Sequence, residues 1–230
     1  MNDTVRVGGR FGTGPLSRAM ALVYSLLVVE LLLVLTTLPG LLPLLLLLDR
    51  DASNLPLVAL CLLPVGPAVS AALYALRHHR PDLADLRPAA LFWRGYRANV
   101  RGVLAIWLPW LLWLTVVGLN LNNFGAAGVP GWWRVPLLLV ALGVTLWGIN
   151  ALVITSLFTF RIRDVARLAL HFLGHAPGVT LGNACLLVVA AGIVWLSSEA
   201  VLGLLGSVLT LALLRNSRPL VGKVEEEFTA

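Results

Sequence analysis

The chain has 230 residues, of which 59% are hydrophobic and 12% are charged. Soluble proteins carry about 25% charged residues, so this composition is typical of an integral membrane protein. Several separate apolar stretches approach the roughly 20 residues that cross a bilayer, which excludes a large water-soluble catalytic domain. The net charge of +6 is assigned to basic segments beside the membrane that contact anionic lipid, and nucleic acid is not expected as a partner.

Apolar runs between charged residues predict an all-α fold, a polytopic bundle of about six membrane-spanning helices. The predicted spans lie near residues 19–38, 55–76, 102–121, 135–160, 178–197 and 200–214. The last two are separated at Ser197–Glu199, because a single helix over residues 178–214 would be roughly 55 Å long, too long for one crossing. Pro39, Gly40 and Pro43 are expected to end the first helix and to begin an irregular outer segment over residues 40–54.

The basic residues give this topology an orientation. Of the 17 Lys and Arg residues, only Arg50 and Arg134 fall on the side opposite to all the others. The positive-inside rule therefore places an N-terminal tail (1–18) and a C-terminal tail (215–230) in the cytoplasm, on either side of a transmembrane domain at 19–214. A five-span chain is the alternative, but it would place the C-terminal cations on the outer side.

Two cytoplasmic hairpins, near residues 77–101 and 161–176, each contain a predicted amphipathic helix. In the first, Phe92 and Val103 share one helical face and three arginines share the other; in the second, Val165 and Phe172 lie opposite two arginines. Such helices lie on the inner leaflet or dock a cytoplasmic partner. The candidate partner or lipid contacts are Arg94, Arg97, Arg101, Arg163 and Arg167.

One stretch carries a family resemblance. The run Pro64-Val65-Gly66-Pro67-Ala68, then Ala71-Ala72-Leu73-Tyr74, is followed by a basic segment and Leu91-Phe92-Trp93-Arg94. This pattern resembles the YesL-like family of bacterial membrane proteins of unknown function, over roughly residues 64–187. The outer segment between the first two spans is longer than in that family. The resemblance implies a multi-pass protein of the bacterial cell (inner) membrane, often associated with carbohydrate uptake loci, with no established catalytic residues.

Glu30 lies near the middle of the first predicted span, where an ionisable side chain is costly and indicates a functional site by default. Ser70 and Asn150 are predicted at a comparable depth, so these three residues form a candidate intramembrane polar site. A protonated Glu30 bonded to Asn150 would satisfy both side chains without any transport role. Alternatively, Glu30 binds a coupling proton or a substrate.

The tryptophans and histidines of the sequence are less informative about function than Glu30. Trp107, Trp110 and Trp113 step by three along the third predicted span, which suits helix packing or a surface that stacks on a sugar ring. His171 and His175 have the spacing of a metal pair but lack a third ligand nearby, so no metal site is predicted. The sequence has no nucleophile with a base, no phosphate loop and no paired carboxylates. Neither an enzyme nor a cofactor is therefore predicted.

The leading functional hypothesis is an auxiliary membrane component of a carbohydrate or other solute uptake system, acting on transport or sensor subunits of the membrane. The alternatives are a stand-alone small-solute transporter that uses the Glu30 carboxylate, and a structural or lipid-organising protein. Substrate and oligomeric state do not follow from these residues.

Overall fold

The computed structural model describes residues 15–46, 51–79, 87–126 and 128–228, and within these ranges the chain forms helices and no strand. The all-α fold is therefore confirmed. Arg6 and Arg10 of the predicted N-terminal tail, Arg50 of the outer segment and residues 80–86 of the first hairpin lie outside the described residues.

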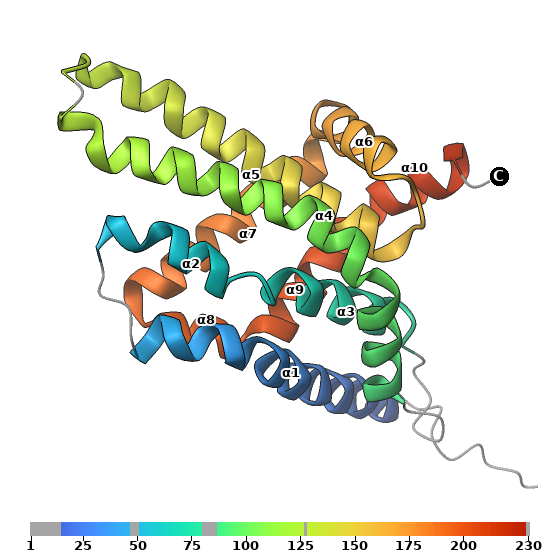
Figure 1. Ribbon diagram of the computed structural model, residues 1–230. Coiled ribbons are helices and arrows are strands. Elements are labelled where there is room, and N and C mark those ends of the chain that lie inside the picture. Colours follow the sequence, from blue (N-terminus) through green and yellow to red (C-terminus); the bar gives the residue numbers. More distant parts are fainter. Residues whose placement is uncertain (1–14, 47–50, 80–86, 127, 229–230) are drawn as a thin grey trace, which may run out of the picture.

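The elements follow one another in chain order (Figure 1). The long helices are α1 (Pro15–Leu46), α4 (Pro88–Asn122), α5 (Arg134–Leu157) and α7 (Pro177–Leu196). The shorter helices are α2 (Leu55–Cys61), α3 (Val65–Arg77), α6 (Ile162–His175), α8 (Glu199–Leu204), α9 (Gly206–Asn216) and α10 (Arg218–Phe228). Short 3-10 turns, η1 (Ala52–Asn54), η3 (Asn123–Gly125) and η4 (Gly131–Trp133), lie at the connections.

Four helices of the described chain are long and apolar enough to cross a membrane: Leu16–Leu44, Pro88–Gly125, Gly131–Leu157 and Pro177–Leu196. A fifth span is present if residues 52–61 and 65–77 count as one helix pair bent by 43°. The sixth predicted span, 200–214, is divided into α8 and α9 at Leu205. The break predicted at Ser197–Glu199 is present, and the Ser198 side chain accepts a hydrogen bond from the Val201 N–H at the start of α8.

Helix α1 continues further than the sequence predicts. Pro39 and Pro43 lie inside the helix, which ends at Leu46 rather than near residue 38. In an apolar environment proline is tolerated inside a helix, because neighbouring helices and local polar side chains can satisfy the backbone. Just before Pro39, the hydroxyls of Thr36 and Thr37 donate to the Leu32 and Leu33 carbonyls at 2.7 and 2.8 Å. The predicted irregular segment is thus helical at least from residue 40 to 46.

The first cytoplasmic amphipathic helix is also not a separate element. It is the first part of α4, which runs without interruption from Pro88 to Asn122 and also contains the third predicted span. Its two faces are as predicted, because Phe92 and Val103 are buried whereas the arginines of this segment are exposed. The second amphipathic helix is a separate element, α6, whose buried face includes Val165 and Phe172.

Helix α3 forms the centre of the bundle. It packs against α1, α4, α5 and α9, and Figure 1 shows it between α1 and the long α4–α5 hairpin. Small residues allow this close packing. A Cβ atom at Gly66 would lie 2.6 Å from the Trp107 ring of α4, and one at Gly95 of α4 would lie 2.6 Å from Tyr74 Cβ of α3.

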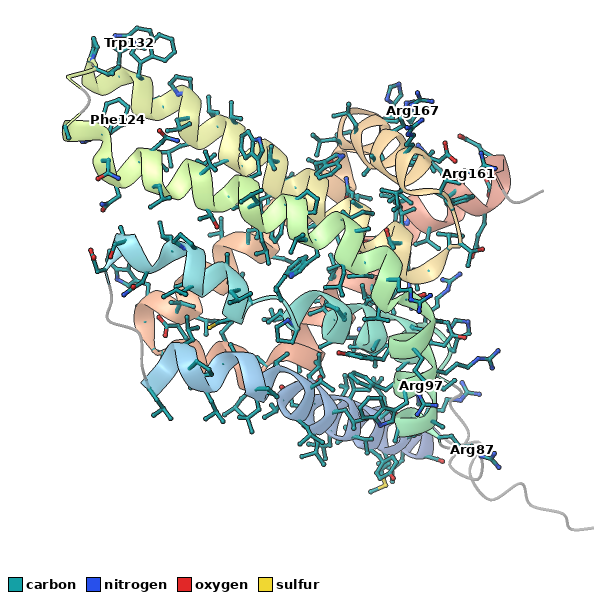
Figure 2. The ribbon with its side chains drawn as sticks, in the orientation of Figure 1. Arg87, Arg97, Phe124, Trp132, Arg161 and Arg167 are labelled. Carbon is teal, nitrogen blue, oxygen red and sulfur yellow. The ribbon has the colours of Figure 1, made fainter. Side chains whose placement is uncertain are left out.

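The two ends of the bundle differ in chemistry. Figure 2 shows Arg87, Arg97, Arg161 and Arg167 toward one end and Phe124 and Trp132 at the other. At the aromatic end, the Arg134 guanidinium lies 5.0 Å from the centre of the Phe124 ring. This separation agrees with the distribution of basic residues in the sequence.

The C-terminal segment predicted as a tail contains a packed helix. Leu220, Val221 and Val224 of α10 are buried in the same core cluster as residues of α3 and α6. Arg77 at the end of α3 forms an ion pair with Glu225 of α10, with 2.6 Å between Nη2 and Oε1. Helix α10 thereby closes the basic end of the bundle.

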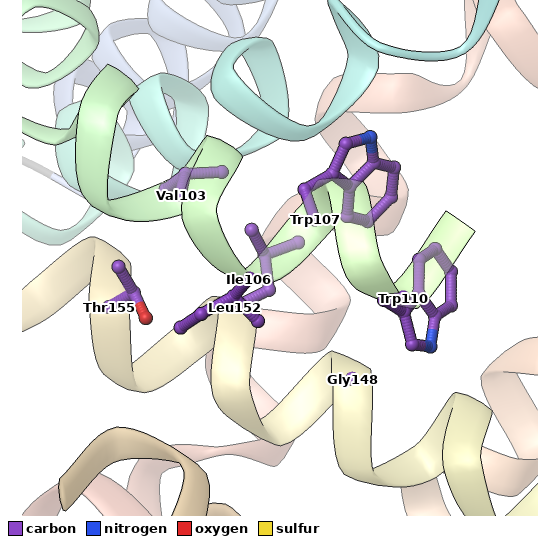
Figure 3. A pocket seen from close by; sticks show the side chains of 7 residues that line it. All are labelled: Val103, Ile106, Trp107, Trp110, Gly148, Leu152 and Thr155. Atoms are coloured by element: carbon purple, nitrogen blue, oxygen red, sulfur yellow. The ribbon is translucent and has the colours of Figure 1, made fainter. Parts of the chain in front are cut away.

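Trp110 joins α4 to α5 (Figure 3). Its indole packs on Gly148 so closely that a Cβ there would overlap the ring, and its Nε1–H donates to the Val144 carbonyl at 3.1 Å. Gly143 on the same helix has nothing within 4 Å of its Cβ position. These two glycines therefore differ in packing but share a helix.

We expect Gly148→Ala to lower the stability of the protein by about 1 to 3 kcal/mol, because the Trp110 ring has to move. The control Gly143→Ala should be neutral or stabilising by up to about 1 kcal/mol, as alanine is the better helix former. Thermal unfolding in detergent measures both. Equal melting temperatures for the two variants would contradict this packing.

Candidate functional site

The three residues of the predicted polar site lie in three different places. Glu30 contacts the start of α9, Ser70 contacts α4, and Asn150 contacts α7. The expected hydrogen bond between Glu30 and Asn150 is not formed, because each side chain has another partner nearer to it. No single intramembrane polar site combines all three.

Glu30 lies at the break between α8 and α9. Its Oε2 accepts a hydrogen bond from the backbone N–H of Ser207 at 2.6 Å. Ser207 is in the first turn of α9, where helical N–H groups have no partner within the helix. The Oε1 atom of Glu30 is buried and has no hydrogen-bond partner among the described residues. The carboxylate thus caps a helix that begins inside the bundle.

Ser70 is part of a bridge that Asn99 makes between three helices. The Nδ2 group of Asn99 on α4 donates to the Ser156 carbonyl of α5 at 2.8 Å and approaches Ser70 Oγ of α3 at 3.3 Å. Ser70 is fully buried, so these contacts satisfy polar atoms that would otherwise lack a partner. Ser70 thus contributes to the packing of α3 against α4.

Asn150 begins a ladder of three asparagines across α5, α7 and α9. Asn183 Nδ2 donates to Asn150 Oδ1 at 3.1 Å, and Asn216 Nδ2 donates to Asn183 Oδ1 at 2.8 Å. Asn150 and Asn183 are each only 1% exposed. Gly182 gives the ladder its space, because a Cβ there would overlap the Asn216 amide. Asn183 was missed in the sequence because it is a single amide in an apolar run, and Asn216 because it lies in the predicted C-terminal tail.

Helices α3 and α9 are half-helices that begin inside the bundle and end in basic residues, Arg77 and Arg215. With 13 and 11 residues, they are roughly 20 and 16 Å long, about two thirds and one half of the thickness of the hydrocarbon core. They pack against each other and against α1. Discontinuous helices of this kind form the ion and substrate sites of many transporters.

The five predicted contact arginines all point outward. Arg94, Arg97 and Arg101 on α4 and Arg163 and Arg167 on α6 are exposed, and within the described chain none of these five forms an ion pair. Helix α6 is held in place by Trp147 of α5, whose Nε1–H donates to the Ala166 carbonyl at 3.0 Å. The arrangement presents guanidinium groups from two rigid elements, which we call the arginine surface, on the basic end.

Two of the three tryptophans of the stripe, Trp107 and Trp110, serve packing, whereas Trp113 is exposed. The Nε1–H of Trp107 donates to the Leu62 carbonyl at 3.1 Å, at the break between α2 and α3. Figure 3 shows the Trp110 ring turned toward Gly148 of α5, whereas the Trp107 ring lies on the side of α4 away from α5 and packs on Gly66 of α3. The cavity that both residues line is about 10 Å³, the space of one water molecule at most. These two rings therefore leave no room for a sugar.

Metal-binding residues do not gather in the described part of the chain. No group of three or more His, Cys, Asp or Glu side chains has the geometry to hold an ion there. His171 and His175 stack with ring centres 3.8 Å apart, and both are exposed on α6.

His79 joins the end of α3 to α1. Its Nδ1 lies 3.0 Å from Ser25 Oγ, and burial lowers the pKa of the imidazole below its usual value. A neutral ring can accept a hydrogen bond from the Ser25 hydroxyl, whereas burial disfavours the charged form of the ring. The neutral form is therefore the one that fits this contact.

Comparison with known proteins identifies one family match. A family model described as "Protein of unknown function, DUF624" matches residues 26–121, which run from α1 through α4. The matched region includes Glu30, Ser70 and the arginines of α4. No curated protein and no solved structure matches the chain. The match supports the expectation of an uncharacterised family.

The contact between His79 and Ser25 predicts a pH-dependent stability. Because the pKa of folded His79 is below the unfolded value of about 6.5, the unfolded chain binds more protons, so stability is full above that value and is lost as pH falls through the folded pKa. The melting temperature should fall more between about pH 7.5 and pH 5 in the native protein than in His79→Gln. The other histidines are present in both proteins, so parallel curves would contradict the assignment.

Proposed function

We propose that this chain is a multi-pass protein of the bacterial cell (inner) membrane, with six spans and both termini in the cytoplasm. In this topology α8 and α9 together form the sixth crossing, and the basic end of the bundle faces the cytoplasm. The position of Arg87, Arg97, Arg161 and Arg167 toward one end of the bundle, with Phe124 and Trp132 at the other, supports this orientation. The packing of α10 at the basic end agrees with a cytoplasmic C-terminus.

Within that membrane, the chain acts as an auxiliary component of a solute uptake system and binds a transport or sensor subunit through the arginine surface. The observation that carries this proposal is the exposure of five guanidinium groups on two helices that the bundle fixes in position. Arginine recognises carboxylates with two parallel hydrogen bonds, so the expected partner surface is acidic.

Carbohydrate is the proposed solute class because of the resemblance to the YesL-like family. The match to an uncharacterised family over residues 26–121 overlaps most of the α3–α4 region that carries this resemblance. The packing of Trp107 and Trp110 favours an auxiliary role over a sugar carrier, because these rings already contact protein.

A stand-alone transporter is the second candidate. The observation in its favour is the half-buried carboxylate at the start of a half-helix. Such an arrangement places an ionisable group next to backbone that can rearrange.

The auxiliary role predicts that changing Arg94, Arg97 and Arg101 to Gln reduces recovery of a partner from native membranes by about tenfold. Three exposed ion pairs at about 0.5 kcal/mol each give this loss. Co-purification in mild detergent with mass spectrometry measures it. The matched variant with Lys at the same positions keeps the charge and should retain most of the partner. Absence of any partner with the native protein would contradict the auxiliary role and favour a transporter or a lipid-organising protein.

The transporter role predicts that Glu30→Gln abolishes pH-dependent solute uptake in cells or vesicles while the fold is retained. Glutamine keeps the shape and the acceptor oxygen for Ser207 but cannot exchange a proton. Normal uptake in this variant would remove the transporter hypothesis. Glu226→Gln, on the exposed face of α10, provides the control for loss of a carboxylate elsewhere.

A further inference from the structure

The geometry points to a proton-binding site at Glu30, in which the buried Oε1 atom takes up the proton and the Oε2 atom holds the start of α9. The inference does not depend on the uptake role or on the partner proposed above. It follows from the position of the carboxyl group, its two unlike oxygens and the helix break that it faces.

Because of the position of Glu30, the energy of the side chain depends strongly on whether it is charged. The residue lies at the middle of the apolar segment Leu16–Leu44, where an ionised side chain requires compensation from the protein. The compensation comes from α9, whose first-turn N–H group at Ser207 and positive helix end face the carboxylate. Gly206 allows this approach, because its Cβ position lies only 3.4 Å from Oε1.

The two carboxyl oxygens differ in what they can do. Oε2 accepts the hydrogen bond from Ser207, whereas Oε1 is buried and, in the part of the chain that the structure describes, has no hydrogen-bond partner. A proton can therefore add to Oε1 without breaking the bond to Ser207, and the side chain changes from a charge of −1 to neutral. Protonation removes the negative charge of the side chain, which is costly in the middle of an apolar segment.

A proton fits this site better than a metal cation. Calcium takes six to eight oxygen ligands, and magnesium requires near-octahedral coordination. The described chain offers no cluster of acidic, histidine or cysteine side chains around Glu30. A single carboxylate oxygen is sufficient to bind a proton, but it cannot provide the several ligands that either metal cation requires.

Other charges do not face Glu30 in the described chain. The helices packed against α1 are α2, α3, α4, α8 and α9. Arg18 is twelve residues away on α1, about 18 Å along the axis, and Arg215 is eight residues beyond Ser207 on α9, about 12 Å. The remaining charged groups of these helices stand toward helix ends: Arg77 on α3, Arg94, Arg97 and Arg101 on α4, and Glu199 on α8. The titratable thiol and phenols of α1 to α4 are Cys61, Tyr24, Tyr74 and Tyr96.

Proton binding has a structural consequence at the break between α8 and α9. The ionised carboxylate attracts the positive end of α9, and the neutral acid does so only weakly. Protonation therefore loosens the first turn of α9 relative to α1. Leu205, where the two helices meet, is the hinge of this change.

The test is infrared difference spectroscopy of the purified full chain in lipid nanodiscs between about pH 4 and pH 9. We expect a carboxylic-acid carbonyl band that titrates in the native protein and is lost in Glu30→Gln but retained in Glu226→Gln. A spectrum that Glu30→Gln leaves unchanged at every pH would overturn the proposal. If Glu30→Gln does not fold, Glu30→Asp has to shift the same band, and an unshifted band has the same negative meaning.

Hydrogen exchange of the peptide that contains Ser207 tests the coupling to α9. After correction for the intrinsic pH dependence of exchange, this peptide should exchange severalfold faster at low pH in the native protein. Glu30→Gln should remove the pH dependence. A pH dependence that persists in this variant would assign it to another group. Both measurements use the isolated protein, so they succeed or fail independently of any partner or uptake activity.

Discussion

Backbone groups that lose their helical partners inside an apolar bundle have to be satisfied by the protein, since water is not available there. This chain interrupts two helices within the bundle, and each interruption is compensated by one side chain from a long helix. Trp107 of α4 donates to the Leu62 carbonyl at the break between α2 and α3. Glu30 of α1 accepts from the Ser207 N–H at the break between α8 and α9. The central half-helices α3 and α9 depend on these two contacts.

The two contacts have opposite electrical character. At Leu62 the acceptor is a carbonyl that also receives the Val65 N–H, and the donor from α4 is a neutral indole, so the contact does not respond to pH. At Ser207 the free group is an N–H and the partner is a carboxyl group, whose strength as an acceptor changes with its charge. The bundle thus holds one half-helix by a constant interaction and the other by one that can vary.

Much of the fold could be predicted from periodicity and charge. The amphipathic faces of α4 and α6, the break after Leu196 and the all-α class depend on local patterns, and the structure confirms them. The ends of α1 and the continuity of α4 could not be predicted, because proline and arginine are read as boundaries by rules derived from water-exposed helices. The six-span count stays a prediction.

The polar contacts between helices could not be predicted from the sequence for a different reason. Glu30 could be singled out because an ionisable side chain is costly in the membrane. Its partner, however, is a backbone N–H 177 residues away, and every residue type except proline has such a group, so the sequence does not indicate which residue is the partner. The asparagine ladder involves Asn183 and Asn216, which are distant in sequence and become neighbours only when α7 and α9 pack. Long-range pairing of this kind requires the arrangement of the helices.

The distance in sequence between Glu30 and Ser207 also sets the order in which the membrane protein is made. Helix α1 is synthesised and inserted long before α9 exists, so the carboxyl group enters the bilayer without its partner. A charged residue at a helix centre costs roughly 2.5 to 3.5 kcal/mol on insertion scales, and a leucine returns about 0.3 to 0.6 kcal/mol. The twelve leucines between Leu16 and Leu44 are sufficient to offset one such residue. The leucine-rich composition of α1 is thus a requirement of biogenesis as well as of the folded state.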